Sequence, residues 1–147
     1  MASVTLIKTC LNMLHFSGVN ALTRRYLQGR GAIFCLHHIL PHSENRPAFA
    51  PNANLETTPE FLSEMIKHVR GRGYETLSLA DALATLKFPQ KPKKPFAVFT
   101  LDDGYKDNQI YAQPVFNRLA CPYTVFVAPG IVEGKTELWW KALEAIS

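Results

Sequence analysis

Two adjacent carboxylates stand where a long apolar run ends: Asp102 and Asp103 directly follow residues 96–101, and Gly104 comes next. A continuous apolar run predicts a strand buried on both faces, and α/β folds place their chemistry at the carboxyl ends of such strands. Like charges this close disfavour joint ionisation unless a cation neutralises one of them. One carboxylate can therefore bind a metal ion while the other acts as a base. The alternative is a pair that caps the next helix or faces solvent.

His37 ends a second apolar run, residues 32–36, which follows a glycine-rich turn. This run also predicts a buried strand. Because the carboxyl ends of parallel strands meet at one edge of a sheet, we expect His37 at the rim of the same site as Asp102 and Asp103. A histidine bonded within a loop or core is the alternative.

Two further histidines, His38 and His42, have the spacing of a metal-binding motif. Pro41 lies between them and would break the helix needed to bring both imidazoles to one face. The spacing alone therefore does not indicate a metal site.

The rest of the chain must position these residues, and it alternates helical and extended patterns. Strand, helix and strand in this order predict a parallel α/β sheet or barrel. Before the apolar run 96–101 we expect two short amphipathic helices over residues 4–27, interrupted at Ser17-Gly18, and a loop over 41–57. A helix capped by Thr58 should follow and stop at 71–73; its inner face is Phe61, Leu62, Met65, Ile66 and Val69. We then expect an extended piece at 74–79, a helix at 80–86 with Ser78 or Leu79 near its cap, and a connector at 89–95.

After the apolar run 96–101 we expect a helix at 108–119 that Pro114 kinks or delays, a buried strand at 123–127 and a helix at 138–146.

Composition limits the class of protein. The chain has 147 residues, 47% of them hydrophobic and 19% charged, which is typical of one globular domain. A net charge of +4 with scattered basic residues does not indicate nucleic-acid binding. No run approaches the roughly 18 apolar residues of a membrane span, and the amino terminus lacks the pattern of a secretory signal. The oligomeric state is left open.

The three cysteines are an odd number at wide spacing and have apolar neighbours. This pattern predicts reduced, buried thiols rather than a disulfide framework or a zinc knuckle. We therefore expect a reducing compartment, the cytoplasm. The three residues are Cys10, Cys35 and Cys121.

Three segments resemble the polysaccharide deacetylases of the NodB-like kind (carbohydrate esterase family 4). Residues 99–105 read F-T-L-D-D-G-Y and resemble the family's first motif, T-F-D-D-G, with Leu101 in place of the usual Phe. Residues 33–39 are similar to its early strand, which ends in a Tyr-His-Arg-like step. Residues 123–130 are similar to its next strand, A-T-F-F-V. The resemblance covers roughly residues 31–140.

The resemblance implies a fold, an activity and two residue roles. The fold would be the N-terminal portion of a (β/α)7-type deacetylase barrel with parallel strands, over residues 31–147, preceded by a helical extension at 1–30. The activity would be metal-dependent removal of N-acetyl groups from poly- or oligosaccharides that contain N-acetylglucosamine. Asp102 would be the general base, and Asp103 a ligand of a divalent metal, typically zinc.

The chain also departs from the family's pattern. Members take two imidazole ligands from a later His-Ser/Thr-x-x-His motif, whereas every histidine here precedes Asp102. The resemblance therefore implies a truncated chain that binds zinc weakly, shows no appreciable deacetylase activity alone and leaves the apolar faces of Val125 and Val127 incompletely covered. The alternative is a catalytically inactive carbohydrate-binding or interaction remnant. A phosphoryl-transfer enzyme would need D-x-D-G-T, which residues 102–105 do not provide.

Overall fold

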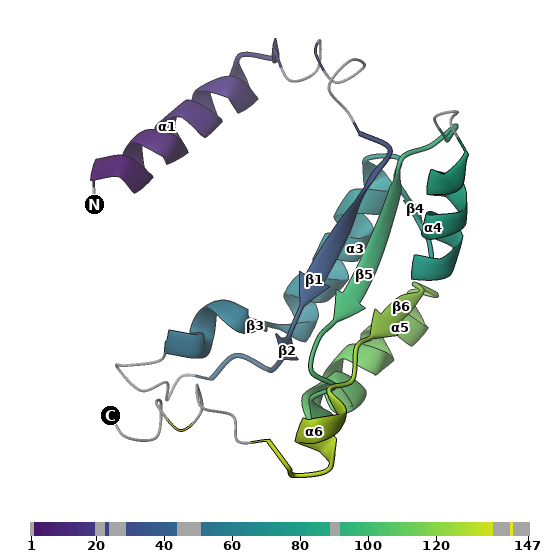
Figure 1. Ribbon diagram of the computed structural model, residues 1–147. Coiled ribbons are helices and arrows are strands. Elements are labelled where there is room, and N and C mark those ends of the chain that lie inside the picture. The colour runs from purple at the N-terminus through teal and green to yellow at the C-terminus, as the bar shows by residue number, and fades with distance from the viewer. Residues whose placement is uncertain are drawn as a thin grey trace.

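The central feature of the molecule is a sheet of four parallel strands, which confirms the α/β prediction (Figure 1). The computed structural model describes residues 2–19, 23, 29–43, 51–88, 92–136 and 142. The longest strands lie side by side in the order β1-β5, and β4 and β6 follow one another along the other edge of β5. The strands are β1 (Gly31–Leu36), β4 (Glu75–Thr76), β5 (Phe96–Leu101) and β6 (Tyr123–Val125).

All six residues of β5 are buried, as predicted. β5 has hydrogen-bonded neighbours on both edges, and helices α3 (Pro59–Gly71) and α5 (Gln113–Arg118) cover the face that carries Phe99. Phe99 packs there against Phe34 of β1 and Phe116 of α5, with ring centroids 5.2 and 5.9 Å apart. Val98, on the opposite face, packs with Ala82 of α4 (Leu79–Lys87). The strand that leads to Asp102 is therefore fixed from both sides.

Helices α3 and α4 begin where the capping residues predict. Thr58 accepts a hydrogen bond from the backbone N–H of Phe61, and Ser78 accepts one from that of Asp81. Pro59 occupies the first turn of α3, where its missing N–H costs nothing. The helix ends at Gly71, and Gly73 has a φ of 85° that glycine adopts without strain.

The burial predicted for β1 and for the inner face of α3 was partly wrong. β1 alternates exposed and half-buried residues instead of being buried on both faces, and Ile33 is 55% exposed. The reason is that α3 and α5 cover only the face of the sheet that carries Phe34. Phe61 was expected on the inner face of α3 but is 62% exposed, and Ser63 is buried in its place.

The helix that carries Pro114 is irregular, as predicted. A π-helical turn (η2, Asn108–Ala112) precedes the regular helix α5, and Pro114 stands in its first turn. Proline lacks the N–H that an α-helical turn would use, so a widened turn precedes it.

Residues 41–57 are not simply a loop. A 3₁₀ helix (η1, Pro51–Leu55) leads into β3 (Glu56–Thr57), which pairs in parallel with β2 (His38–Ile39). The backbone N–H of Leu40 also donates to the carbonyl of Thr57. This second, two-stranded sheet holds the segment that follows His37.

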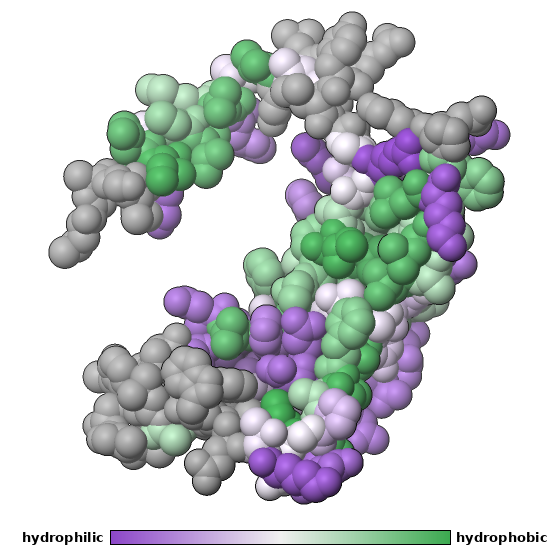
Figure 2. Space-filling view, viewed as in Figure 1, coloured by the Kyte–Doolittle hydropathy of each residue, from purple (hydrophilic) through white to green (hydrophobic). Residues whose placement is uncertain are grey.

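The first amino-terminal helix is confirmed as α1 (Ala2–Phe16), and the second predicted helix lies almost wholly outside the described residues. The side chains of residues 6–19 are exposed, and Figure 2 shows apolar groups along α1. Among the described helices, none has the length and apolar character needed to cross a membrane.

At the carboxyl side, β6 is shorter and less buried than predicted. It ends at Val125, which is half-buried, while Val127 is 55% exposed and precedes a short helix, α6 (Pro129–Val132). The helix predicted over 138–146 lies, apart from residue 142, outside the described residues, as do residues 89–91 of the connector.

Candidate active site

The parallel register places Asp102 and His37 at the same edge of the sheet. Leu36, the last residue of β1, is paired with Leu101, the last residue of β5, so His37 and Asp102 follow at the same level. The backbone N–H of Asp102 donates to the carbonyl of Leu36 at 2.9 Å. His37 Nε2 lies 3.9 Å from Asp102 Oδ2. The two residues therefore meet where the sequence places them.

The Asp102 carboxylate is held but remains accessible. Its Oδ2 accepts a hydrogen bond from Cys35 Sγ at 3.1 Å. The side chains of His37 and Asp102 are 29% and 34% exposed, so solvent reaches both. A carboxylate fixed in this way can accept a proton from a water molecule beside it.

The Cys35 thiol acts as a donor here. Its hydrogen bond to Asp102, reinforced by burial and by the negative charges of Asp102 and Asp103, raises the pKa of the Cys35 thiol, and a hydrogen bond with Thr100 only partly opposes this. A nucleophilic cysteine needs the opposite environment. Cys35 is therefore a protonated neighbour of the carboxylate and not a nucleophile.

The prediction of buried cysteines was wrong for two of the three. All three are free thiols, but Cys10 and Cys35 are exposed, and Cys121 alone of the three is buried. Burial raises the pKa of the Cys121 thiol, and nearby Arg70 lowers it in part. Cys35 is exposed because it lies on the uncovered face of β1.

Asp103 and Gly104 form a left-handed turn directly after Asp102. Their φ angles are 68° and 71°. A Cβ on residue 104 would lie 3.3 Å from Cγ2 of Val127, so both the backbone angle and the space favour glycine there. The turn ends the alternation of the strand at Asp102, so the two carboxylates are not forced to opposite faces of the sheet.

The described residues do not form a complete metal centre. Within the parts of the chain that the structure describes, no group of three or more His, Cys, Asp or Glu side chains is arranged to hold an ion. The two histidines of the motif-like pair have different surroundings: His38 Nδ1 lies 2.7 Å from Asp107 Oδ2, whereas His42 is exposed.

A polar cluster beside the site escaped the sequence analysis. The side chains of His38 and Asp107 are each 12% exposed, and the ring of Tyr105 stacks on that of His38 with centroids 3.7 Å apart. Asp107 Oδ1 also accepts from the backbone N–H of Ile39 at 3.0 Å and from the Asn108 amide at 2.9 Å. We call these five residues the His38–Asp107 cluster.

The His38–Asp107 cluster ties the segment after β1 to the segment after β5. The Asn108 amide also donates to the carbonyl of His37 at 2.9 Å. The one feature of the sequence that could have indicated this cluster is a third aspartate, Asp107, which lies five residues after Asp102 at the start of a helix. Only the fold shows that its partner is His38.

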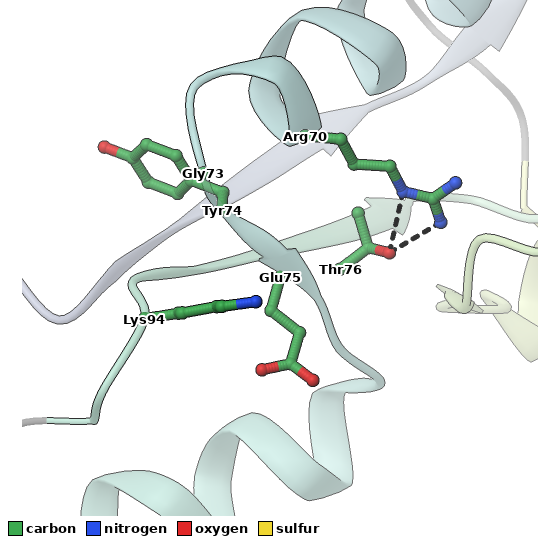
Figure 3. Close-up of a pocket in the computed structure, with 6 residues that line it drawn as sticks. All are labelled: Arg70, Gly73, Tyr74, Glu75, Thr76 and Lys94. Carbon is green, nitrogen blue, oxygen red and sulfur yellow. Dashed lines mark hydrogen bonds between the residues drawn. The ribbon is translucent and has the colours of Figure 1, made fainter.

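A pocket of about 300 Å³ is lined mainly by residues from the end of α3 to β4 (Figure 3). Its lining includes Glu75, which is paired with the first residue of β5, so the pocket lies at the opposite end of this strand from Asp102. Arg70 at the pocket wall is fully engaged: it donates to Thr76 Oγ1 and to the carbonyls of Leu119 and Ala120. Arg70 therefore connects α3 by hydrogen bonds to β4 and to the turn after α5. The lining residues are Arg70, Gly73, Tyr74, Glu75, Thr76 and Lys94.

Arg70→Ala is expected to lower the free energy of unfolding by about 2 to 3 kcal/mol, because it leaves half-buried acceptors without their charged donor. Urea unfolding followed by circular dichroism measures the loss. Lys67→Ala is the matched control: Lys67 forms only an exposed ion pair with Glu64, so it should change stability by less than about 0.5 kcal/mol. Equal losses of unfolding free energy in the two variants would show that the hydrogen bonds of Arg70 do not stabilise the fold in this way.

No model of a known protein family matches the chain. In sequence it is similar to YxkH of Bacillus subtilis (strain 168), which is assigned by name to the polysaccharide deacetylases, with 35% identity over 68 residues. The match covers 46% of this chain and 24% of YxkH.

Solved deacetylases share the fold. IcaB from Ammonifex degensii has a TM-score of 0.55 and 22% identity, over 68% of this chain and 39% of IcaB. The Streptococcus pyogenes deacetylase PplD, solved with acetate, has a TM-score of 0.60 and 24% identity, over 72% of this chain and 46% of PplD. The de-N-acetylase of Aggregatibacter actinomycetemcomitans has a TM-score of 0.50 and 15% identity, over 64% and 36%.

The chain thus spans about a quarter of its curated relative and less than half of each solved structure. The sequence match and the shared fold agree: the chain resembles the polysaccharide deacetylases over part of their length and has part of their fold.

Proposed function

We propose that this chain supplies the base and one metal-binding carboxylate of a hydrolase that removes N-acetyl groups from poly- or oligosaccharides containing N-acetylglucosamine. The observation that carries the proposal is the Asp102 carboxylate, which is oriented by Cys35, faces His37 and stays open to solvent at the carboxyl edge of the sheet. The deacetylase names of YxkH and PplD support the same reaction class.

The chemistry assigned to Asp102 is proton transfer. Hydrolysis of an N-acetyl group forms a bond between a water oxygen and the acetyl carbon and breaks the bond from that carbon to nitrogen. Asp102 would accept the proton of the attacking water, and that proton must finally reach the departing amine. His37, 3.9 Å from Asp102, would line the rim of the site beside this proton.

A divalent metal, most simply zinc, enters the proposal through Asp103 alone. Catalytic zinc sites use three protein ligands and an open position. Asp103 is half-buried in the turn next to the base, but the described residues do not provide the remaining ligands. They therefore do not fit a complete zinc site, and the proton transfer is assigned to Asp102 without one.

We expect the 147-residue protein alone to bind zinc weakly and to release no appreciable acetate from an N-acetylated chito-oligosaccharide, because one carboxylate leaves most of the coordination shell to water. Isothermal titration with zinc and an acetate assay measure both properties. Tight stoichiometric zinc binding with metal-dependent acetate release would contradict this expectation and direct the search for ligands to His37, His38 and His42.

A longer polypeptide that contains residues 1–147 and matches the length of the relatives tests the function itself. It should release acetate in the presence of zinc and lose this activity with a chelator. Failure to release acetate from any N-acetylated sugar polymer, in a folded and zinc-loaded protein, would reject the proposed function.

The second candidate is a carbohydrate-binding or interaction remnant without catalysis. The incomplete metal site among the described residues favours it for the 147-residue protein. Binding of the oligosaccharide without acetate release, both in this protein and in the longer polypeptide, would distinguish it from the enzyme.

A further inference from the structure

A side chain of β1 and one from the residue directly after this strand converge on a single oxygen of Asp102. Cys35 is the second-last residue of β1, and His37 is the first residue beyond it. Cys35 Sγ lies 3.1 Å and His37 Nε2 3.9 Å from the same atom, Asp102 Oδ2. The backbone N–H of Asp102 is fixed separately, by the carbonyl of Leu36.

This arrangement makes the two carboxylate oxygens unequal. Oδ2 accepts a hydrogen bond from the Cys35 thiol and lies near the His37 imidazole. Among the described residues, no side chain forms a hydrogen bond or ion pair with Oδ1. A base must present one oxygen within hydrogen-bond reach of the proton it takes. A donor that holds Oδ2 selects which oxygen is presented.

We propose that Cys35 is a positioning residue, whose thiol holds Asp102 Oδ2 so that Oδ1 is turned to the water that attacks the acetyl group. This inference rests on the proposed function for its catalytic consequence and on the geometry alone for the contact. His37 Nε2 lies 3.9 Å from the same oxygen.

The thiol suits this role because it stays protonated at neutral pH. The neighbouring carboxylate raises the pKa of the Cys35 thiol, so the sulfur keeps its hydrogen and donates it. A serine hydroxyl at the same position would keep a donor of similar geometry, whereas alanine would remove it.

Thiol reactivity tests whether the Asp102 carboxylate acts on the Cys35 thiol, without any need for activity. In Asp102→Asn, the carboxylate that favours the protonated thiol is gone, so Cys35 should be alkylated by iodoacetamide about three times faster or more at pH 8. Peptide mass spectrometry follows Cys35 and, as an internal control, the exposed Cys10, whose rate should not change. An unchanged Cys35 rate would overturn the inference.

Kinetics test the consequence in the longer polypeptide. Cys35→Ala should lower kcat for acetate release about three- to tenfold at unchanged KM, the effect of losing one hydrogen bond to a charged group. Cys35→Ser should stay within about twofold of the unsubstituted protein, and Cys10→Ser should match it. Unchanged kcat in Cys35→Ala, or equal losses in the Ala and Ser variants, would overturn the positioning role.

The acetate-release and alkylation experiments test different claims, so a negative result in one does not decide the other. An unsubstituted longer polypeptide that releases no acetate rejects the proposed function, and the alkylation rates then decide whether Cys35 holds Asp102. Faster alkylation in Asp102→Asn would support the contact, and an unchanged rate would overturn it.

Discussion

Asp102→Asn is expected to lower kcat for acetate release by about 100- to 10,000-fold in the longer polypeptide, the usual contribution of a positioned general base. The amide keeps the size of the side chain and can accept a hydrogen bond from Cys35, but it cannot take a proton from water. Zinc should stay bound, because the proposed function gives the ligand role to Asp103. Acetate release under saturating substrate and zinc titration measure the two effects.

Asp103→Asn is the paired variant, and it should lose zinc first and turnover as a result. Excess zinc should therefore restore part of the activity of Asp103→Asn and none of that of Asp102→Asn. Equal loss of zinc affinity in both variants would reject the separation of base and ligand, and full activity in Asp102→Asn would reject Asp102 as the base.

Asp107→Ala is expected to lower the free energy of unfolding by about 3 to 5 kcal/mol, because it leaves three hydrogen-bond donors in a nearly buried place without their acceptor, each at a cost of about 1 to 3 kcal/mol. Asp107 accepts from His38, from the backbone N–H of Ile39 and from Asn108, and water reaches little of the pair. Urea unfolding of the 147-residue protein measures the loss directly.

Asp81→Ala is the matched control, because Asp81 also accepts a side-chain hydrogen bond, from Ser78, but is exposed. It should cost less than about 1 kcal/mol. A loss below about 1 kcal/mol in Asp107→Ala would show that the His38–Asp107 pair contributes little to stability. A double-mutant cycle with His38→Ala would then separate the hydrogen bond from the packing against Tyr105.

The parts of the fold that depend on local chemistry could be predicted from the sequence. Thr58 and Pro59 mark the start of α3 because a cap and a proline act within one turn, and the apolar run 96–101 predicts a buried strand because no charged residue interrupts it. Asp102 and His37 could be placed at one edge because parallel strands end together.

What escaped prediction depends on distant parts of the chain. β1 is as apolar as β5 over its last residues, yet Ile33 is exposed, because cover is supplied by other elements and only one face of β1 receives it. The partners of Asp107 and Cys35 lie 69 and 67 residues away, and no periodicity or spacing in the sequence encodes such pairs. Sequence patterns therefore locate the carboxylates but not the groups that orient them.

The left-handed turn at residue 103 has a consequence for how this position can vary. If the chain were selected for stability alone, glycine would suit a φ of 68° better than aspartate, whose Cβ carries a steric cost there. Aspartate tolerates this conformation better than most other non-glycine residues, because its short polar side chain can form local hydrogen bonds. Glycine at residue 104 therefore suits the turn, while aspartate at residue 103 fits the same turn and keeps the carboxylate that the proposed function uses.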